Sequence, residues 1–236
     1  MSSLTLTVSE QLATVLCARG GDATRSWLER AAAEAVVSHL ATLPSAYTGA
    51  SRYVGRGDLA LTPSEQQALA SATPEYSFAG WTEYDAARAV LLLEAAAATP
   101  GETFLRRAVA CYELGDAREQ QSWLKAVGLL PHPERFLAVA VDACRTNMRT
   151  VFESIACENP YPSRYFPERN FNQMVLKALF VGVALQRIVG LATRLNPELT
   201  RMAADYAAER RAAGRSVPGD LGLALHRGAV AKEQVQ

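Results

Sequence analysis

The stretch from Cys157 to Lys177 contains the residues of this chain whose types and spacing best suit a functional site. It begins with CENPYPSRYFP, in which three prolines exclude a continuous helix because each fixes φ and lacks an amide hydrogen. A stiff loop with polar side chains is a common place for binding or catalytic residues. The alternative is a packed connection whose polar side chains only bind backbone groups. The candidates on this loop are Glu158, Asn159, Tyr161 and Tyr165.

A helix predicted to begin at Pro167 carries a second set of polar candidates. Three polar residues lie on one stripe of this helix, because they are spaced by three and four positions: Asn170, Gln173 and Lys177. The rest of the helix surface is apolar nearly all round. Such a helix is expected to be central, and a buried polar stripe needs partners. Glu153 and Glu158 are the candidates to pair with Lys177, which would suit acid/base chemistry. The alternative is a lysine whose stem covers apolar surface while its ammonium reaches water.

Other chemistries lack the spacing that they require. Cys157 would need a nearby base or positive charge to act as a nucleophile, and no histidine forms a local motif with it. The four cysteines contain no C-x-x-C pair and the three histidines no H-x-x-x-H pair, and no glycine-rich phosphate loop is present. The sequence therefore predicts no metal site, no cofactor and no disulfide framework.

Charge and hydropathy narrow the possible partners. Lys and Arg total 24, as do Asp and Glu, so a zero formal net charge predicts no nucleic-acid role. The longest apolar run, residues 178–185, is far shorter than the ~18 residues of a membrane span. The first residues lack the basic and apolar regions of a signal peptide. These observations predict a cytoplasmic protein with reduced thiols and no direct membrane span.

The elements that must position the candidates are predicted to be helices. Thr62-Pro63-Ser64-Glu65 combines a hydroxyl N-cap, proline at the first helical position and glutamate at N3, and Thr82 with Asp85 repeats the pattern. Asn196-Pro197-Glu198 begins a final long helix that should end near Gly214. Apolar stripes begin at Val8, Trp27 and Phe104 with helical spacing. Since no comparable alternation of period two occurs, the predicted fold is all-α with essentially no sheet.

Residues 108–131 read as one tetratricopeptide-like helical hairpin, with Gly115-Asp116 ending the first helix and capping the second. Segments 134–147 and 167–182 are predicted to continue this stacking, which would give a solenoid-like set of hairpins. A region rich in proline and glycine between residues 44 and 80 separates this part from the N-terminus. We predict an N-terminal helical subdomain with a turn-rich linker (1–80), a helical domain (81–218) and a weakly structured tail (219–236).

Four segments of the chain resemble the EboA family: DACRTN, ACENPYPSRYFPERNFNQMVLKALF, RIVGL and NPEL. The resemblance covers roughly residues 81–218. It implies a helical protein without a defined activity, encoded beside a prenyltransferase-like membrane protein and several enzymes, with a part in making, modifying or exporting a small metabolite. A prenylated metabolite is among the candidates. The positions in the motif are Asn147, Glu153, Glu158, Asn159, Tyr161, Tyr165, Asn172 and Lys177.

Two classes of function follow from these residues. The first is a non-catalytic helical binding or adaptor protein, whose partners are a small-molecule metabolite and other proteins of the same pathway cluster. The second is an enzyme with a buried acid/base pocket, in which Glu158 or Glu153 pairs with Lys177 to act on a small polar or cyclitol-like metabolite. The sequence favours the first, because no catalytic triad or metal-ligand spacing is present, and leaves open whether the protein is an enzyme.

Overall fold

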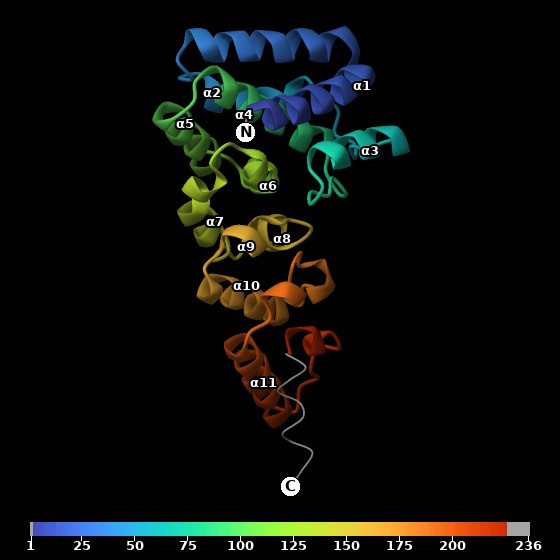
Figure 1. Ribbon diagram of the computed structural model, residues 1–236, viewed down its shortest axis with the longest axis vertical. Helices are drawn as coiled ribbons and strands as arrows, with labels where there is room; N and C mark the ends of the chain where they lie inside the picture. Colours follow the sequence, from blue (N-terminus) through green and yellow to red (C-terminus); the bar gives the residue numbers. More distant parts are fainter. Residues whose placement is uncertain (1, 226–236) are drawn as a thin grey trace. The chain divides into compact units, whose positions relative to one another are not determined.

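Every regular element in residues 2–225, the part of the chain that the computed structural model describes, is a helix (Figure 1). The only pairing of extended backbone in this range is an isolated bridge between Asp58 and Thr82. The prediction of an all-α fold without a sheet is therefore confirmed. Within the same residues, no helix has both the length and the apolar character needed to cross a membrane.

The chain divides into two compact units, unit 1 (Met1–Ala143) and unit 2 (Cys144–Gln236). This division differs from the predicted ranges 1–80, 81–218 and 219–236. Helix α4 (Glu83–Ala98), which follows residue 80, packs closely against α1 (Ser2–Val37), which precedes it. Segments from both predicted ranges therefore share one core.

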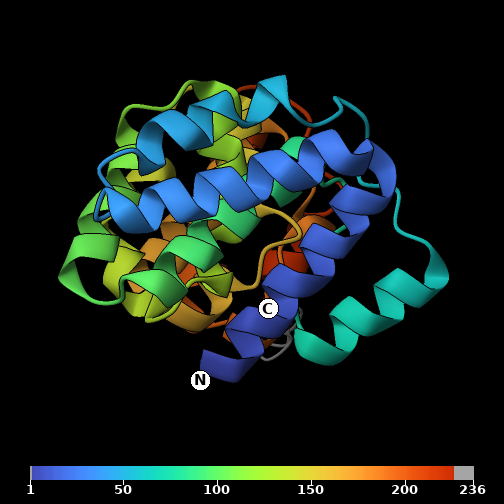
Figure 2. The same cartoon turned by 90° about the horizontal axis from the view of Figure 1, so that it is seen from above.

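Helix α1 bends sharply at Gly21, where φ is 63° and ψ is −153° (Figure 2). A residue without Cβ adopts this conformation at little steric cost. The bend separates two arms, and each arm buries one of the apolar stripes predicted from the sequence. Val8 and Leu12 are buried on the first arm, and Trp27 and Leu28 on the second.

Helix α4 forms the centre of unit 1 because its sequence, EYDAARAVLLLEAAAA, is apolar on nearly every side. It packs against α1, α2 (Leu43–Gly49) and α6 (Ala117–Ala126). The predicted capping boxes are both present: Thr82 begins α4, and Thr62 begins α3 (Pro63–Ala72).

Helices α5 (Glu102–Glu113) and α6 form the predicted hairpin. The side chain of Asp116 accepts hydrogen bonds from the amides of Arg118 and Glu119 and so caps α6. Trp123 packs back on α5 and donates its indole hydrogen to the Ala108 carbonyl at 2.7 Å. The stacking of further hairpins into a solenoid stays a prediction. The remaining elements of unit 1 are η1 (Ala50–Arg52), η2 (Val127–Leu129), η3 (Pro133–Phe136) and α7 (Leu137–Ala143).

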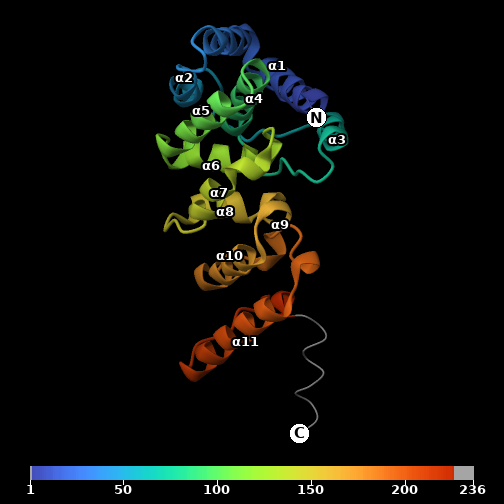
Figure 3. The same cartoon turned by 60° about the vertical axis from the view of Figure 1, so that its left-hand side comes forward.

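In unit 2, α10 (Glu168–Val181) packs against both α8 (Arg149–Ala156) and α11 (Pro197–Ala212) (Figure 3). As predicted, Asn196 caps α11, and the helix ends just before Gly214. In the predicted tail, η6 (Leu221–Ala224) packs on α11, while residues 226–236 lie outside the described residues. The other elements are α9 (Tyr161–Tyr165), η4 (Leu185–Arg187) and η5 (Ala192–Arg194).

Candidate functional site

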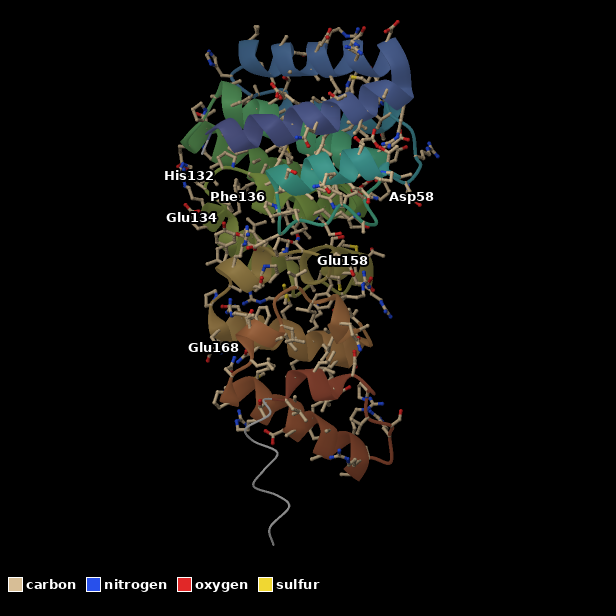
Figure 4. The ribbon with its side chains drawn as sticks, turned by 45° about the vertical axis from the view of Figure 1, so that its right-hand side comes forward. Asp58, His132, Glu134, Phe136, Glu158 and Glu168 are labelled. Carbon is tan, nitrogen blue, oxygen red and sulfur yellow. The ribbon has the colours of Figure 1, made fainter. Side chains whose placement is uncertain are left out.

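Glu153 and Glu158 bind Arg187, a residue that lies outside the predicted Cys157–Lys177 segment. The Arg187 guanidinium donates two hydrogen bonds of 2.8 Å to the two carboxylate oxygens of Glu158 (labelled in Figure 4) and one of 2.7 Å to Glu153. Arg149 donates to the other oxygen of Glu153 at 2.6 Å. The four side chains therefore form one network of alternating charge.

Glu158 is held through its backbone as well as its side chain. Its φ of 50° lies in the left-handed region, which a residue with a Cβ rarely adopts. Its amide donates to the Arg187 carbonyl at 2.8 Å, so backbone and side chain both bind the same arginine. These bonds hold the turn at Glu158, which lies directly before the proline-containing loop.

The network keeps Glu153 ionised. Burial acts to raise the pKa of this carboxyl, but hydrogen bonds from Arg149 and Arg187 outweigh burial, and the pKa lies below its usual 4.5. Hydrogen bonds to Glu158 and to Glu153 raise the pKa of Arg187. A carboxylate of low pKa bound to two arginines is poorly suited to donate or to accept a proton near neutral pH.

The lowered pKa of Glu153 predicts a dependence of stability on pH. Because the folded pKa is lower than the unfolded one, the stabilisation is present above the unfolded pKa of about 4.5 and is lost as the pH falls through the folded value. We expect a titration of the Glu153 carboxyl by NMR to give a pKa below 4.5. Arg187→Met should move that pKa upward; an unchanged pKa in this variant would show that Arg187 does not cause the shift.

Lys177 has partners other than the glutamates. Its ammonium donates to the carbonyls of Cys144 at 2.5 Å and Thr146 at 2.6 Å, and lies 4.9 Å from the centre of the Phe152 ring. Burial lowers the pKa of the ammonium. The predicted pairing with Glu153 or Glu158 is wrong, because Arg187 occupies both carboxylates and backbone carbonyls occupy the lysine.

The predicted stiff loop contains a short helix, α9, and its polar side chains bind the loop itself. Asn159 is buried, donates to the Ser154 carbonyl and accepts from the Tyr161 amide, both at 3.0 Å. The fully buried Tyr161 ring packs against the rings of Tyr165 and Phe166. These contacts favour the alternative of a packed connection over a set of free polar groups.

Arg194 binds the C-terminal end of the loop. Its two terminal nitrogens donate to the carbonyls of Ser163 at 2.6 Å and Phe166 at 2.8 Å, and its guanidinium lies 4.7 Å from the centre of the Phe171 ring. Neither Arg187 nor Arg194 was among the predicted residues. The only sequence signal is that they lie within or near the RIVGL and NPEL segments.

The predicted stripe on α10 is not a buried one. Gln173 is exposed and Asn170 is half-buried, and Phe180 is 60% exposed, so α10 is not apolar and buried all round as predicted. The buried amide on this helix is Asn172, which exchanges two hydrogen bonds of 2.9 and 3.0 Å with Asn196. Since Asn196 also caps α11, this pair fixes α10 against α11. Asn147, the remaining predicted residue, is exposed.

Cys157 is buried, which disfavours reaction of its thiol. Burial raises its pKa to about 12. At pH 8 a thiol of this pKa is a thiolate in only about one molecule in ten thousand. We expect iodoacetamide to modify Cys157 in the folded chain at least ~10-fold more slowly than in the urea-unfolded chain, as measured by peptide mass spectrometry. Equal rates in the two states would instead identify a reactive cysteine.

A pocket of about 510 Å³ lies in unit 1, within the turn-rich region that precedes α4. The ring centres of Tyr76 and Phe78 are 6.3 Å apart, and those of Phe78 and Trp81 are 4.9 Å apart with planes inclined by 60°. The pocket is therefore aromatic with a few polar groups. Its lining includes Asp58, Leu61, Gln66, Tyr76, Phe78 and Trp81.

Neighbouring segments hold the pocket wall in place. The Leu59 amide donates to the Trp81 carbonyl at 2.7 Å, and Lys125 donates to the Gly80 carbonyl at 2.8 Å. Tyr76 lies against Gly128, where a Cβ would come within 2.3 Å of the tyrosine oxygen. Any larger residue at position 128 must therefore displace the ring. The cluster EYSFAGW was the available sequence signal for this pocket.

A buried polar network joins α4 to α6 beside this wall. Ser122 donates to Asp85 at 2.6 Å and accepts from Arg88 at 3.1 Å, while Arg88 forms an ion pair with Glu119 at 3.7 Å. Lys125 binds Asp85 at 2.7 Å as well as the pocket carbonyl of Gly80. Each buried charge thus has an opposite partner, and the network connects the core of unit 1 to the pocket.

Comparisons with known proteins agree with the resemblance. A family model described as metabolite traffic protein EboA matches residues 8–225, which extends beyond the 81–218 range predicted from the motifs. No curated protein and no solved structure matches the chain. Within residues 2–225, no group of three or more histidine, cysteine, aspartate or glutamate side chains is placed to hold a metal ion.

Proposed function

Because the chain belongs to the EboA family, described as metabolite traffic proteins, we propose that it binds a small metabolite without changing it chemically. The observation that carries this proposal is the aromatic pocket of unit 1. Its volume of about 510 Å³ and its lining of three aromatic side chains with three polar ones, Asp58, Gln66 and Ser77, are typical of small-molecule sites. We therefore place the metabolite in this pocket rather than on the Cys157–Lys177 segment.

The contacts of Lys177 disfavour the alternative of an acid/base enzyme. It required Lys177 beside Glu153 or Glu158, whereas both glutamates bind Arg187 and the lysine binds carbonyls. The raised pKa of Cys157 also disfavours a thiolate nucleophile. These contacts favour a structural role for the segment: it holds α8, α9 and α10 together.

Binding without turnover is the test of this proposal. The full chain is incubated with a small-molecule extract of its source cells, and native mass spectrometry then measures adducts before and after denaturation. We expect a one-to-one adduct that is released with unchanged mass. Phe78→Leu in the pocket should reduce the adduct, and Gln173→Ala on the predicted segment should not. No adduct, or consumption of the compound over time, would contradict the proposal.

We also propose a protein partner from the same pathway cluster, with unit 2 as the contact surface. Phe180 is 60% exposed, and Val181 and Met148 are also exposed. Arg149, next to Met148, donates to the Gly182 carbonyl at 3.2 Å, so these apolar side chains share one region. In co-expression with each cluster protein, Phe180→Glu should abolish co-purification, whereas Leu114→Glu, at a 76% exposed leucine of unit 1, should not. Equal recovery with both variants would contradict this contact.

A further inference from the structure

Three aromatic side chains line the pocket of unit 1. Tyr76, Phe78 and Trp81 all line it, and each ring contacts the next. The face of an aromatic ring carries a partial negative charge, so an organic cation placed over it is attracted. This attraction is stronger where the cation leaves water, as it would inside a pocket.

Asp58 supplies the only full charge among the residues that line the pocket (labelled in Figure 4). Among the described residues, its carboxylate forms no ion pair and no side-chain hydrogen bond, whereas Glu153, Asp85 and Glu119 are all paired. A carboxylate without a partner beside three aromatic rings favours a positively charged ligand.

Two protein cations approach the pocket wall, and both are already neutralised. Arg19 donates to the Ala60 carbonyl at 3.0 Å and pairs with Glu65 at 3.3 Å. Lys125 donates to the Gly80 carbonyl and pairs with Asp85 at 2.7 Å. Since each cation has its own carboxylate, the charge left unbalanced at the pocket is the negative charge of Asp58.

We infer that this pocket binds an organic cation, a metabolite with an ammonium group that lies over the aromatic faces and close to Asp58. The inference rests on the proposed function, because it names the chemical class of the metabolite bound there. A ligand carrying a carboxylate or a phosphate is disfavoured, since its charge would meet Asp58. The pocket is large enough for an ammonium group with an aromatic or aliphatic body.

The test compares three probes of similar size by isothermal titration calorimetry on the full chain: benzyltrimethylammonium, benzyl alcohol and phenylacetate. We expect the cation to bind at least ~10-fold more tightly than the other two. Asp58→Asn should weaken the cation about 5-fold or more, because it removes the unbalanced charge. Glu113→Gln removes an exposed carboxylate of unit 1 away from the pocket lining and should leave binding unchanged.

A second variant locates the bound cation. Gly128→Ala places a Cβ where the Tyr76 oxygen lies and should weaken the cation without changing the charge of the pocket. Equal binding of the three probes, or an Asp58→Asn variant that binds as the wild type does, would overturn the cation inference and leave metabolite binding intact. If none of the probes binds while the extract still gives a pocket-dependent adduct, the inference alone fails. If the extract gives no adduct either, both proposals fail.

Discussion

Replacing Arg88 by methionine is expected to lower the free energy of unfolding of unit 1 by about 3–5 kcal/mol. Arg88 is 3% exposed, donates to the Tyr47 carbonyl and to Ser122, and forms an ion pair with Glu119. Methionine fills a similar volume but donates no hydrogen bond, so a buried carboxylate and a buried carbonyl lose their partner. All three tryptophans lie in unit 1, so their fluorescence during urea unfolding measures this unit alone.

The matched control for this variant is Arg135→Met. Arg135 also pairs with a glutamate of unit 1, Glu102, but its side chain is 38% exposed. An exposed pair of this kind contributes about 0–1 kcal/mol, so the control should unfold near the wild-type midpoint. A loss below about 1 kcal/mol for Arg88→Met would mean that water replaces the arginine in the core and that the network is not needed for the fold.

The sequence predicted those helices whose signals are local. Thr62 and Thr82 cap their helices as predicted, because a capping box needs only residues three apart. The network around Arg88 could not be predicted in this way. Asp85 and Arg88 on α4 bind Ser122 and Glu119 on α6, which lie 31 to 37 residues further along the chain. A single arginine within the apolar sequence AARAVLLL does not indicate which residue it binds.

The candidate site shows the same limit. The prolines after Cys157 predicted that no continuous helix runs through this segment, and the structure has only the short α9 there. The sequence did not predict which cation would bind Glu153 and Glu158. Lys177 was the candidate because it lies on the polar stripe of the next helix, but Arg187, 29 and 34 residues from the two glutamates, forms the bonds. The turn at Glu158 brings the Arg187 guanidinium within reach.

The pocket of unit 1 escaped prediction for a different reason. It is built from α3 and from the turns around it between residues 58 and 81, and the sequence predicted that region as a linker with one short helix. What makes the region a pocket is contact with residues far along the chain, including Gly128 and Lys125. The one sequence signal for this pocket was the closely spaced aromatic residues of the EYSFAGW cluster.

Replacing Arg194 by alanine is expected to destabilise the segment from α9 to α10 by about 2–3 kcal/mol. Its guanidinium binds two carbonyls, those of Ser163 and Phe166, at the C-terminal side of α9, and packs on Phe171. Hydrogen bonds with a charged donor contribute about 1.5–3 kcal/mol each, and partial exposure of Arg194 reduces the sum. Hydrogen exchange measured by mass spectrometry should show faster exchange of the amides of Arg164 and Phe166, which are hydrogen-bonded within α9.

Arg194→Lys separates the two contributions to this effect. A lysine retains the charge and a place over Phe171, but a single ammonium lacks the planar fork that reaches both carbonyls. We therefore expect the lysine variant to recover less than half of the lost protection. Arg201→Ala is the control, since that arginine is exposed and its ion pairs among the described residues are with Glu198 and Asp205, on its own helix. Full recovery by lysine would mean that charge and ring packing, rather than the two carbonyl bonds, hold the loop.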